Sequence, residues 1–237
     1  GQHQSVNTPL IGMAQDRLAS FEPAFADELA VLLRFAFEHM QKPDGSAVWL
    51  RLSTRALAQP DRVLDPQSVI AGAYWAVPPA PGAPIAIAYQ GALAPEAQEA
   101  FAALREDVPE AGLLAITSPD RLHADWLARR GESPVARRLA PLARDAGLVP
   151  ILDGHPAAHA WLGGVHGQAV EPLGVSRFGQ AGDIPDLYKA YGLDAEAILD
   201  ACARALVRRC AGVAGVPPVN LPPSTGEAGA TAVHLGA

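Results

Sequence analysis

From residue 85 onward, short apolar segments alternate with amphipathic ones, and this alternation restricts the possible folds more than any other feature of the sequence. The apolar segments carry no regular polar positions, which is typical of strands buried on both faces of a parallel sheet. Such strands need helices on both sides. The sequence therefore predicts a three-layer α/β/α domain with a mostly parallel sheet over residues 85–212. Its expected strands are 85–89, 112–117, 148–152 and 169–175, and its expected helices are 95–106, 120–130, 133–146 and 156–162.

Residues 173–201 contain the clearest helix boundaries in the chain. Asp183 and Asp194 each precede a helical pattern, where a carboxylate can accept hydrogen bonds from the first free N–H groups. Gly192 stands between the two patterns and can take the left-handed conformation that ends a helix. The second helix is expected to bury one apolar stripe. The stripe consists of Ile198, Leu199, Cys202, Leu206 and Cys210.

A helix and a strand are predicted near the start of the chain. Pro23 suits the first turn of a helix, where its missing N–H would have no partner. The helix itself is expected at residues 24–40, and a turn at 43–45 leads into a strand at 47–52. The helix is indicated by one apolar face at helical spacing: Phe25, Leu29, Leu32, Leu33, Phe37 and Met40.

Two other segments are expected to lack regular structure. Prolines recur through residues 56–84, and because proline fixes φ and removes a backbone donor, this stretch is predicted to be an extended interdomain linker. After residue 212, Pro, Gly, Ser and Ala dominate without periodicity. Residues 213–237 are therefore predicted to form a flexible tail.

Composition excludes several classes of function. The net charge of −7 argues against a nucleic-acid surface, which needs clustered Lys and Arg. Prolines and glycines interrupt the uncharged stretches before they reach the length of a membrane span. Cys202 and Cys210 lie two turns apart on one expected helix, about 12 Å at 1.5 Å per residue, which is too far for a disulfide. Two unpaired thiols and no signal-like start lead us to expect a cytoplasmic protein.

Four segments together resemble a known family, in the same order along the chain. They read FEPAFADELAVLL at 21–33, VWLRLSTR at 48–55, ITSPDRLHADW at 116–126 and LGVSRFGQAGDIPDLYKAYGLDAEAILDA at 173–201. The set resembles the C-terminal, transketolase-type part of the thiamine diphosphate-dependent first component of pyruvate dehydrogenase, in its homodimeric bacterial form. The resemblance extends to about residue 211. It rests on the ordered set, because no single segment is a catalytic signature.

The resemblance implies a division of the chain into four parts. Residues 1–55 would be the C-terminal end of a pyrimidine-binding domain, 56–84 a Pro-rich linker, 85–212 a transketolase C-terminal-like domain and 213–237 a tail. We expect the chain to be a fragment, because the family's upstream cofactor-binding region is absent from the sequence. Such a fragment would supply dimer contacts and a wall of the substrate channel, and would be inactive alone.

The resemblance also implies the chemistry of the intact enzyme. That chemistry is the oxidative decarboxylation of a 2-oxo acid (pyruvate) on thiamine diphosphate and Mg²⁺, with acetyl transfer to a lipoyl group. The expected partners are a second copy in a homodimer, the upstream cofactor-binding region and the lipoyl acyltransferase of the complex. The family holds the diphosphate through a Gly-Asp-Gly motif followed by paired asparagines. Gly182-Asp183-Ile184 lacks the third glycine and no Asn pair follows, so no cofactor is expected to bind this chain alone.

His3 is the one catalytic candidate. The resemblance aligns it with a family histidine that faces the substrate beside the thiamine ring, and a histidine titrates near neutral pH. The family continues with an acidic, glycine-bearing, His-rich segment, whereas residues 4–10 here read QSVNTPL. This departure leaves the identity of the substrate open.

Two further groups of polar residues have simpler structural interpretations. Asp153, His155 and His159, with His166 further on, could suggest a metal site, but no Cys or Glu stands at ligand spacing and the segment fits a strand-to-helix turn. We predict no metal there. Ser118, before Pro119-Asp120, is predicted to cap a helix rather than to act in a site.

Two alternative functions remain open at this stage. One is a non-enzymatic α/β interaction or assembly module. The other is a transketolase-like enzyme acting on sugar phosphates, which would need a basic phosphate site that Arg51 and Arg55 could supply only in part. The sequence has neither a Gly-x-Ser-x-Gly elbow nor a Gly-x-x-x-x-Gly-Lys phosphate loop.

Overall fold

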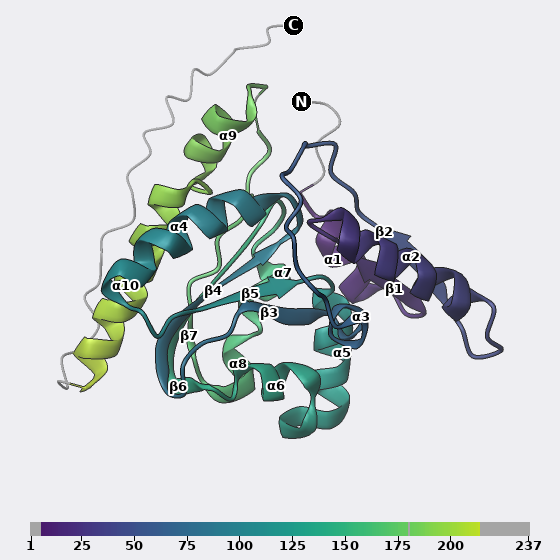
Figure 1. Cartoon of the computed structure of the whole chain (residues 1–237), viewed down its shortest axis with the longest axis horizontal. Coiled ribbons are helices and arrows are strands. Elements are labelled where there is room, and N and C mark those ends of the chain that lie inside the picture. The colour runs from purple at the N-terminus through teal and green to yellow at the C-terminus, as the bar shows by residue number, and fades with distance from the viewer. Residues whose placement is uncertain (1–5, 180, 214–237) are drawn as a thin grey trace, which may run out of the picture.

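The computed structural model describes residues 6–179 and 181–213, and it contains a five-stranded sheet covered by helices on both faces (Figure 1). The strand order is β3-β5-β4-β6-β7. Every neighbouring pair is parallel except β3 and β5. The predicted α/β class with a mostly parallel sheet is therefore confirmed. The strands are β3 (Ala73–Val77), β4 (Ala83–Gln90), β5 (Gly112–Ile116), β6 (Leu142–Leu152) and β7 (Ala169–Val170).

Strand β4 lies at the centre of the sheet and its side chains divide between two cores. Ile85, Ile87 and Tyr89 belong to the core beneath α4 (Ala94–Asp107) and α10 (Ala195–Val213). Ala86 and Ala88 face the opposite core, beneath α5 (Pro119–Arg129), α6 (Pro134–Leu139) and α8 (Gly163–His166). All five side chains are fully or almost fully buried. This burial on both faces explains why the strand shows no polar alternation in sequence.

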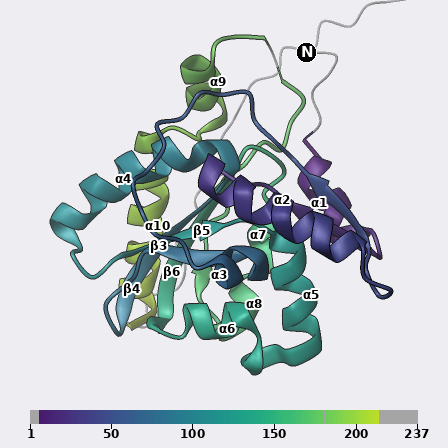
Figure 2. The same ribbon diagram turned by 45° about the vertical axis from the view of Figure 1, so that its right-hand side comes forward.

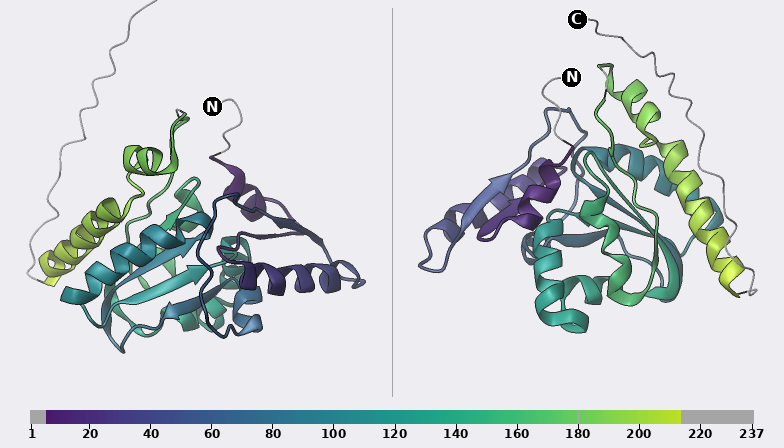
Figure 3. Two further views of the ribbon diagram at one scale, coloured as in Figure 1. Left: turned by 45° about the horizontal axis from the view of Figure 1, so that its top comes forward. Right: turned by 180° about the vertical axis from the view of Figure 1, so that it is seen from behind.

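A smaller unit at the start of the chain packs beside this domain, on the side opposite to α10 (Figure 3). It comprises α1 (Thr8–Ala14), β1 (Leu18–Phe21), α2 (Ala26–Met40) and β2 (Ala47–Leu50). Strands β1 and β2 are parallel and form a separate two-stranded sheet, with α2 as the crossover between them. Figure 2 shows α2 lying alongside the unit's strands and above α3 (Pro66–Ala71).

The apolar face predicted for α2 is only partly buried. Phe25 and Leu32 are inside the core, but Leu33, Phe37 and Met40 are 39%, 63% and 46% exposed. These three residues follow i, i+4, i+7 spacing, so they form one stripe on the outer side of the helix. The helix expected at 24–40 is confirmed as α2, and its apolar face extends beyond the part that the described residues cover.

The prediction of an extended linker over residues 56–84 is wrong for its second half, which contains α3 and β3. The Asp65 carboxylate accepts hydrogen bonds from the N–H groups of Gln67 and Ser68, Pro66 occupies the first turn, and Gly72 ends the helix at φ 107°. The many prolines concealed these start and stop signals. Even the first half is held in place, because Arg62 pairs with Asp27 of α2 at 2.8 Å.

Two further boundaries differ from the sequence-based expectations. The helix expected at 133–146 ends at Leu139, and β6 begins at Leu142. Pro141 explains this, because it has no N–H to donate to the carbonyl four residues earlier and its ring clashes with that turn of the helix. The strand expected at 169–175 is β7, which ends at Val170, and only Leu173 forms a further isolated bridge, to Ile151. The N–H groups of Glu171 and Leu173 still donate to the carbonyls of Leu148 and Pro150, but Pro150 has no N–H to donate back to the carbonyl of Glu171, so the regular ladder stops there.

The helix caps predicted near the C-terminus are confirmed. Asp183 accepts a hydrogen bond from the N–H of Asp186 at the start of α9 (Ile184–Tyr191), and Gly192 ends that helix at φ 66°. Asp194 caps α10 through the N–H of Ala197. Ser118 caps α5 through the N–H of Arg121, also as expected.

On α10, Cys202 is buried but Cys210 is exposed, so the prediction of Cys210 as a core residue is wrong. The region assigned to a flexible tail is described only at Val213, which still belongs to α10; residues 214–237 lie outside the described part. Among the described helices, none combines the length and the apolar character that crossing a membrane requires.

Candidate functional site

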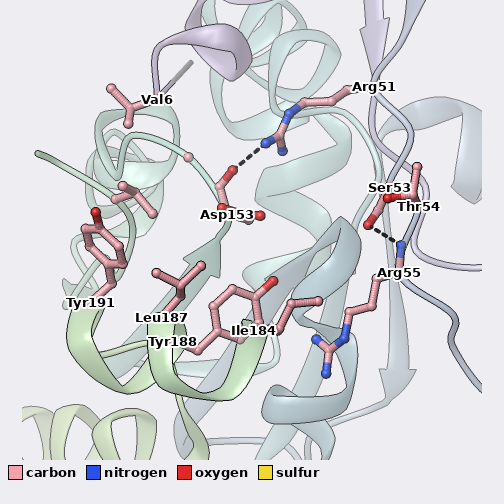
Figure 4. A pocket seen from close by; sticks show the side chains of 12 residues that line it. Val6, Arg51, Ser53, Thr54, Arg55, Asp153, Ile184, Leu187, Tyr188 and Tyr191 are labelled. Atoms are coloured by element: carbon pink, nitrogen blue, oxygen red, sulfur yellow. Dashed lines mark hydrogen bonds between the residues drawn. The ribbon is translucent and has the colours of Figure 1, made fainter. Parts of the chain in front are cut away.

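A cavity of about 380 Å³ lies between the segment that follows β2, the carboxyl end of β6, and α9 (Figure 4). Asp153 and Gly154 come directly after β6 and line the cavity. In this sheet the chain passes from β4 to β5 on one side and then to β6 on the other. The carboxyl ends of β4 and β6 therefore flank a switch in strand order, which is where open α/β sheets bind their ligands.

Arg51 joins the two units of the protein at this cavity. One terminal nitrogen, Nη2, donates to the backbone carbonyl of Asp153 at 2.6 Å, as Figure 4 shows. The other, Nη1, donates to a carboxylate oxygen of Glu22, which follows β1. The side chain of Glu22 is 8% exposed and that of Arg51 is 25% exposed. The ion pair is therefore buried at its acidic end and open to the cavity at its basic end.

Behind Arg51, a chain of polar groups continues into the core. Gln90, at the end of β4, donates from Nε2 to Glu22 at 2.6 Å. Its carbonyl oxygen lies 2.7 Å from Nε2 of His159, in α7 (Ala157–Ala160). Because the Gln90 oxygen can only accept, His159 carries its proton on Nε2. The Nδ1 atom of this histidine has no partner among the described residues.

Burial controls the ionisation of both ends of this chain. It raises the pKa of the Glu22 carboxyl above 4.5, although the Arg51 guanidinium and the Gln90 amide act in the opposite direction. Burial also lowers the pKa of His159 to about 3, so this ring is neutral at physiological pH. A neutral histidine beside a buried carboxylate is a hydrogen-bonding element, since it holds the Gln90 amide in one orientation.

Arg55 forms a second ion pair on the same side of the cavity. Its two terminal nitrogens lie 2.7 and 2.8 Å from the two carboxylate oxygens of Glu96 in α4, and Nη1 also donates to the carbonyl of Ala92 at 2.8 Å. The hydrogen bonds with Glu96 raise the pKa of Arg55. The guanidinium carbon lies 5.5 Å from the centre of the Tyr188 ring.

The opposite wall is formed by α9 and is largely apolar. Ile184, Leu187, Tyr188 and Tyr191 line it. Burial, and secondarily the Asp153 carboxylate, raises the pKa of the Tyr188 hydroxyl. The Asp153 carboxylate itself accepts no hydrogen bond and makes no ion pair within residues 6–179 and 181–213. The cavity thus combines two compensated arginines, one unpaired carboxylate and two tyrosines.

Among the described residues, the structure does not bring together the histidines that were singled out from the sequence. His3 lies outside the described residues. His155 accepts a hydrogen bond from the N–H of Ala157 through Nδ1, His159 pairs with Gln90, and His166 contacts the carbonyl of Ala136 at 2.7 Å. The three histidines are thus engaged in different interactions. In the described part of the chain no three His, Cys, Asp or Glu side chains gather in a way that could hold a metal ion.

Thiamine diphosphate with Mg²⁺ does not fit the described residues. A metal-bound diphosphate needs several oxygen ligands for the cation, and Asp153 is the only carboxylate among the residues that line the cavity. Its arginines, Arg51 and Arg55, are already paired with Glu22 and Glu96. The described residues around this cavity therefore do not offer the donor set that a metal-bound diphosphate needs.

Sequence reasoning missed Glu22 and Gln90. Gln90 could have been noticed in the sequence, because a polar residue at the carboxyl end of an otherwise apolar central strand lies at the ligand-binding edge of a parallel sheet. Glu22 stands between Phe21 and Pro23, and nothing in this local sequence distinguishes it from a surface acid.

Comparison with known proteins places the fold. No family model matches the sequence, and no curated protein matches it. Among solved structures, transketolase from Pichia stipitis superposes with a TM-score of 0.67 at 18% identity, over 87% of this chain and 28% of that one. Transketolase from Leishmania mexicana gives 0.67 at 20% identity over the same shares. A split-gene transketolase, described as an inactive β4 tetramer, gives 0.63 at 19% identity over 86% of this chain and 63% of that one.

These similarities establish the fold: the chain has the architecture of the C-terminal part of transketolases. It spans 28% of the length of the Pichia and Leishmania enzymes. At 18–20% sequence identity the comparison identifies the fold but not the reaction that the protein catalyses.

Proposed function

We propose that this chain is the scaffold portion of a thiamine diphosphate-dependent enzyme that acts on a 2-oxo acid. In this proposal the cofactor is held by a separate region, and the present chain supplies the dimer contacts and one wall of the substrate channel. The intact homodimer decarboxylates pyruvate oxidatively and passes the acetyl group to the lipoyl group of an acyltransferase partner. The chain alone is inactive.

The observation that carries the proposal is the incomplete sheet of the N-terminal unit. Strand β1 is closed on its outer side, because Thr117, Ser118 and Asp120 bond to the backbone groups of Ser20 and Glu22 at 2.6–2.9 Å. Strand β2 pairs with β1 alone, and no other strand in the described part of the chain reaches its far edge. A two-stranded parallel sheet is marginal by itself, since parallel strands are normally covered within larger sheets.

The exposed stripe of Leu33, Phe37 and Met40 on α2 supports the same interpretation. An apolar stripe and an open strand edge in the same small unit fit a larger domain of which this unit is one end. The transketolases of similar fold are more than three times as long as the matched portion, which leaves room for such a domain.

The choice of a 2-oxo acid over a sugar phosphate rests on the paired arginines and on the sequence resemblance. A phosphate group is bound best by guanidinium groups that are free to pair with it. Arg51 and Arg55, which would be the cations of this cavity, are each in contact with a glutamate.

A transketolase-like activity on sugar phosphates is the second candidate. It is favoured by the solved structures of similar fold, one of which is a transketolase complex with a sugar phosphate. The intact enzyme, with its cofactor region and Mg²⁺, should be assayed with pyruvate and lipoamide, with formation of S-acetyldihydrolipoamide as readout, and in parallel with a ketose phosphate and an aldose phosphate. Turnover of pyruvate supports the proposal and turnover of the ketose phosphate selects the second candidate. Activity with neither supports an interaction module without catalysis.

A further inference from the structure

The cavity at the end of β6 has one charge that no neighbour compensates. Arg51 is in contact with Glu22, and Arg55 forms a two-pronged ion pair with Glu96. Within each of these two pairs the positive and negative charges cancel. Asp153 remains, and its carboxylate has no hydrogen-bond or ion-pair partner in the described part of the chain. Among the charged side chains that line the cavity and their ion-pair partners, one negative charge therefore remains, although two arginines line it.

The wall facing Asp153 suits the body of an organic ligand. Ile184 and Leu187 provide aliphatic surface, and Tyr188 and Tyr191 provide two aromatic rings on one side of α9 (Figure 4). Both rings already attract cations: Arg55 lies 5.5 Å from the centre of Tyr188 and Arg177 lies 5.4 Å from that of Tyr191. Tyrosine faces favour positive charge because of their quadrupole.

We propose that this cavity binds a small organic cation, with an apolar or aromatic body against α9 and one ammonium group on the Asp153 carboxylate. A volume of about 380 Å³ is adequate for a ligand of this size. Thr54, which also lines the cavity, offers a hydroxyl that can accept a second hydrogen bond from the ammonium. This site goes beyond the proposed function and does not depend on which reaction the intact enzyme performs.

The test uses three probes of one shape and different charge: benzylammonium, benzyl alcohol and benzoate. Each is titrated at neutral pH into the 237-residue chain, with calorimetry for affinity and amide chemical shifts for location. Benzylammonium is expected to bind at least about fivefold more tightly than the alcohol. It should shift the amide signals of Thr54, Gly154 and Leu187, and benzoate should not compete with it.

Two variants locate the charge. Asp153→Asn removes the carboxylate while keeping its shape, and should reduce benzylammonium affinity about five- to tenfold. Asp200→Asn is the matched control, because Asp200 is an exposed carboxylate on α10, away from the cavity, and it should bind benzylammonium as the wild type does. Thermal unfolding of both variants reports whether they fold.

Three results would overturn the proposal. Benzoate could bind more tightly than benzylammonium, which would mean that the arginines dominate the field of the cavity. Benzylammonium could bind wild type and Asp153→Asn equally, or fail to bind at tens of millimolar. The comparison of the three probes on wild type needs no variant, so it decides the sign of the charge even if Asp153→Asn does not fold.

Discussion

The carboxylate of Glu22 and the guanidinium of Arg51 form an ion pair across 29 residues of sequence, and this pair ties β1, β2 and the end of β6 together. Because Arg51 reaches the carbonyl of Asp153 with its other terminal nitrogen, the pair connects the N-terminal unit to the main sheet. The buried position of Glu22 makes the pair important for stability, and its dependence on pH can be measured.

Replacing Arg51 by Met should destabilise the protein by about 2–4 kcal/mol at neutral pH, because it leaves the buried Glu22 carboxylate without its cation. The loss should be smaller at pH 5, where Glu22 can take up a proton and shed its charge. Urea unfolding at pH 5 and 7.5 measures both values. Arg34→Met is the control: Arg34 is 83% exposed in its pair with Glu38, and its removal should cost under about 0.5 kcal/mol. Equal losses for the two variants would contradict the structure.

The raised pKa of Glu22 predicts a pH dependence with a definite sign. Between 4.5, the ordinary value, and the raised folded value, the folded state binds more protons than the unfolded state. The contribution of Glu22 to stability therefore falls as pH rises through that interval. Glu22→Gln cannot titrate, so its stability relative to wild type should improve as pH rises above 4.5 and then level off. A relative stability that is constant, or that declines with pH, would show that the folded pKa is not raised.

His159 should give the free energy of unfolding the opposite dependence on pH. Its folded pKa of about 3 lies below the ordinary 6.5, so between these values the unfolded state binds the extra proton and stability falls as pH falls. The ring should remain neutral in the folded protein, and its Cε1–H signal in the NMR spectrum should not move between pH 8 and pH 5. A titration of that signal near pH 6 would mean that the ring is accessible to water.

Gly91→Ala should be costly because of Glu22. Gly91 has φ +59°, and an added Cβ would clash with the carboxylate of Glu22. Gly82 is a matched control, since its φ is +79° but a Cβ there meets nothing within 4 Å. We expect Gly82→Ala to cost about 1 kcal/mol from backbone strain alone and Gly91→Ala about 1–2 kcal/mol more. Similar losses for the two variants would mean that Glu22 moves aside freely.

Much of the architecture could be predicted from the sequence, because the strongest signals are local. Strand β4 is apolar up to its last residue, Gln90, since it is buried on both faces. Asp183 begins α9 with a side-chain cap and Gly192 ends it with a left-handed backbone conformation. Predictions failed where a distant contact decided the outcome. The stretch 56–84 was expected to be an extended linker, yet it contains α3, and Arg62 ties its first half to Asp27 of α2.

The candidate site was less accessible to sequence reasoning than the fold. Arg51 and Arg55 were visible as possible anion-binding residues, but their charges are cancelled by Glu22 and Glu96, which are 29 and 41 residues away. The sequence does not show such pairings, because they arise only when β1, β2 and α4 meet. His3 remains a prediction, since it lies outside the described residues.

The central claim is that this chain supports a cofactor site that it does not itself form. Calorimetric titration of the 237-residue chain with thiamine diphosphate and Mg²⁺ tests it most directly. The account predicts no saturable heat of binding at micromolar concentrations of cofactor. A tight complex with one cofactor per chain would contradict it.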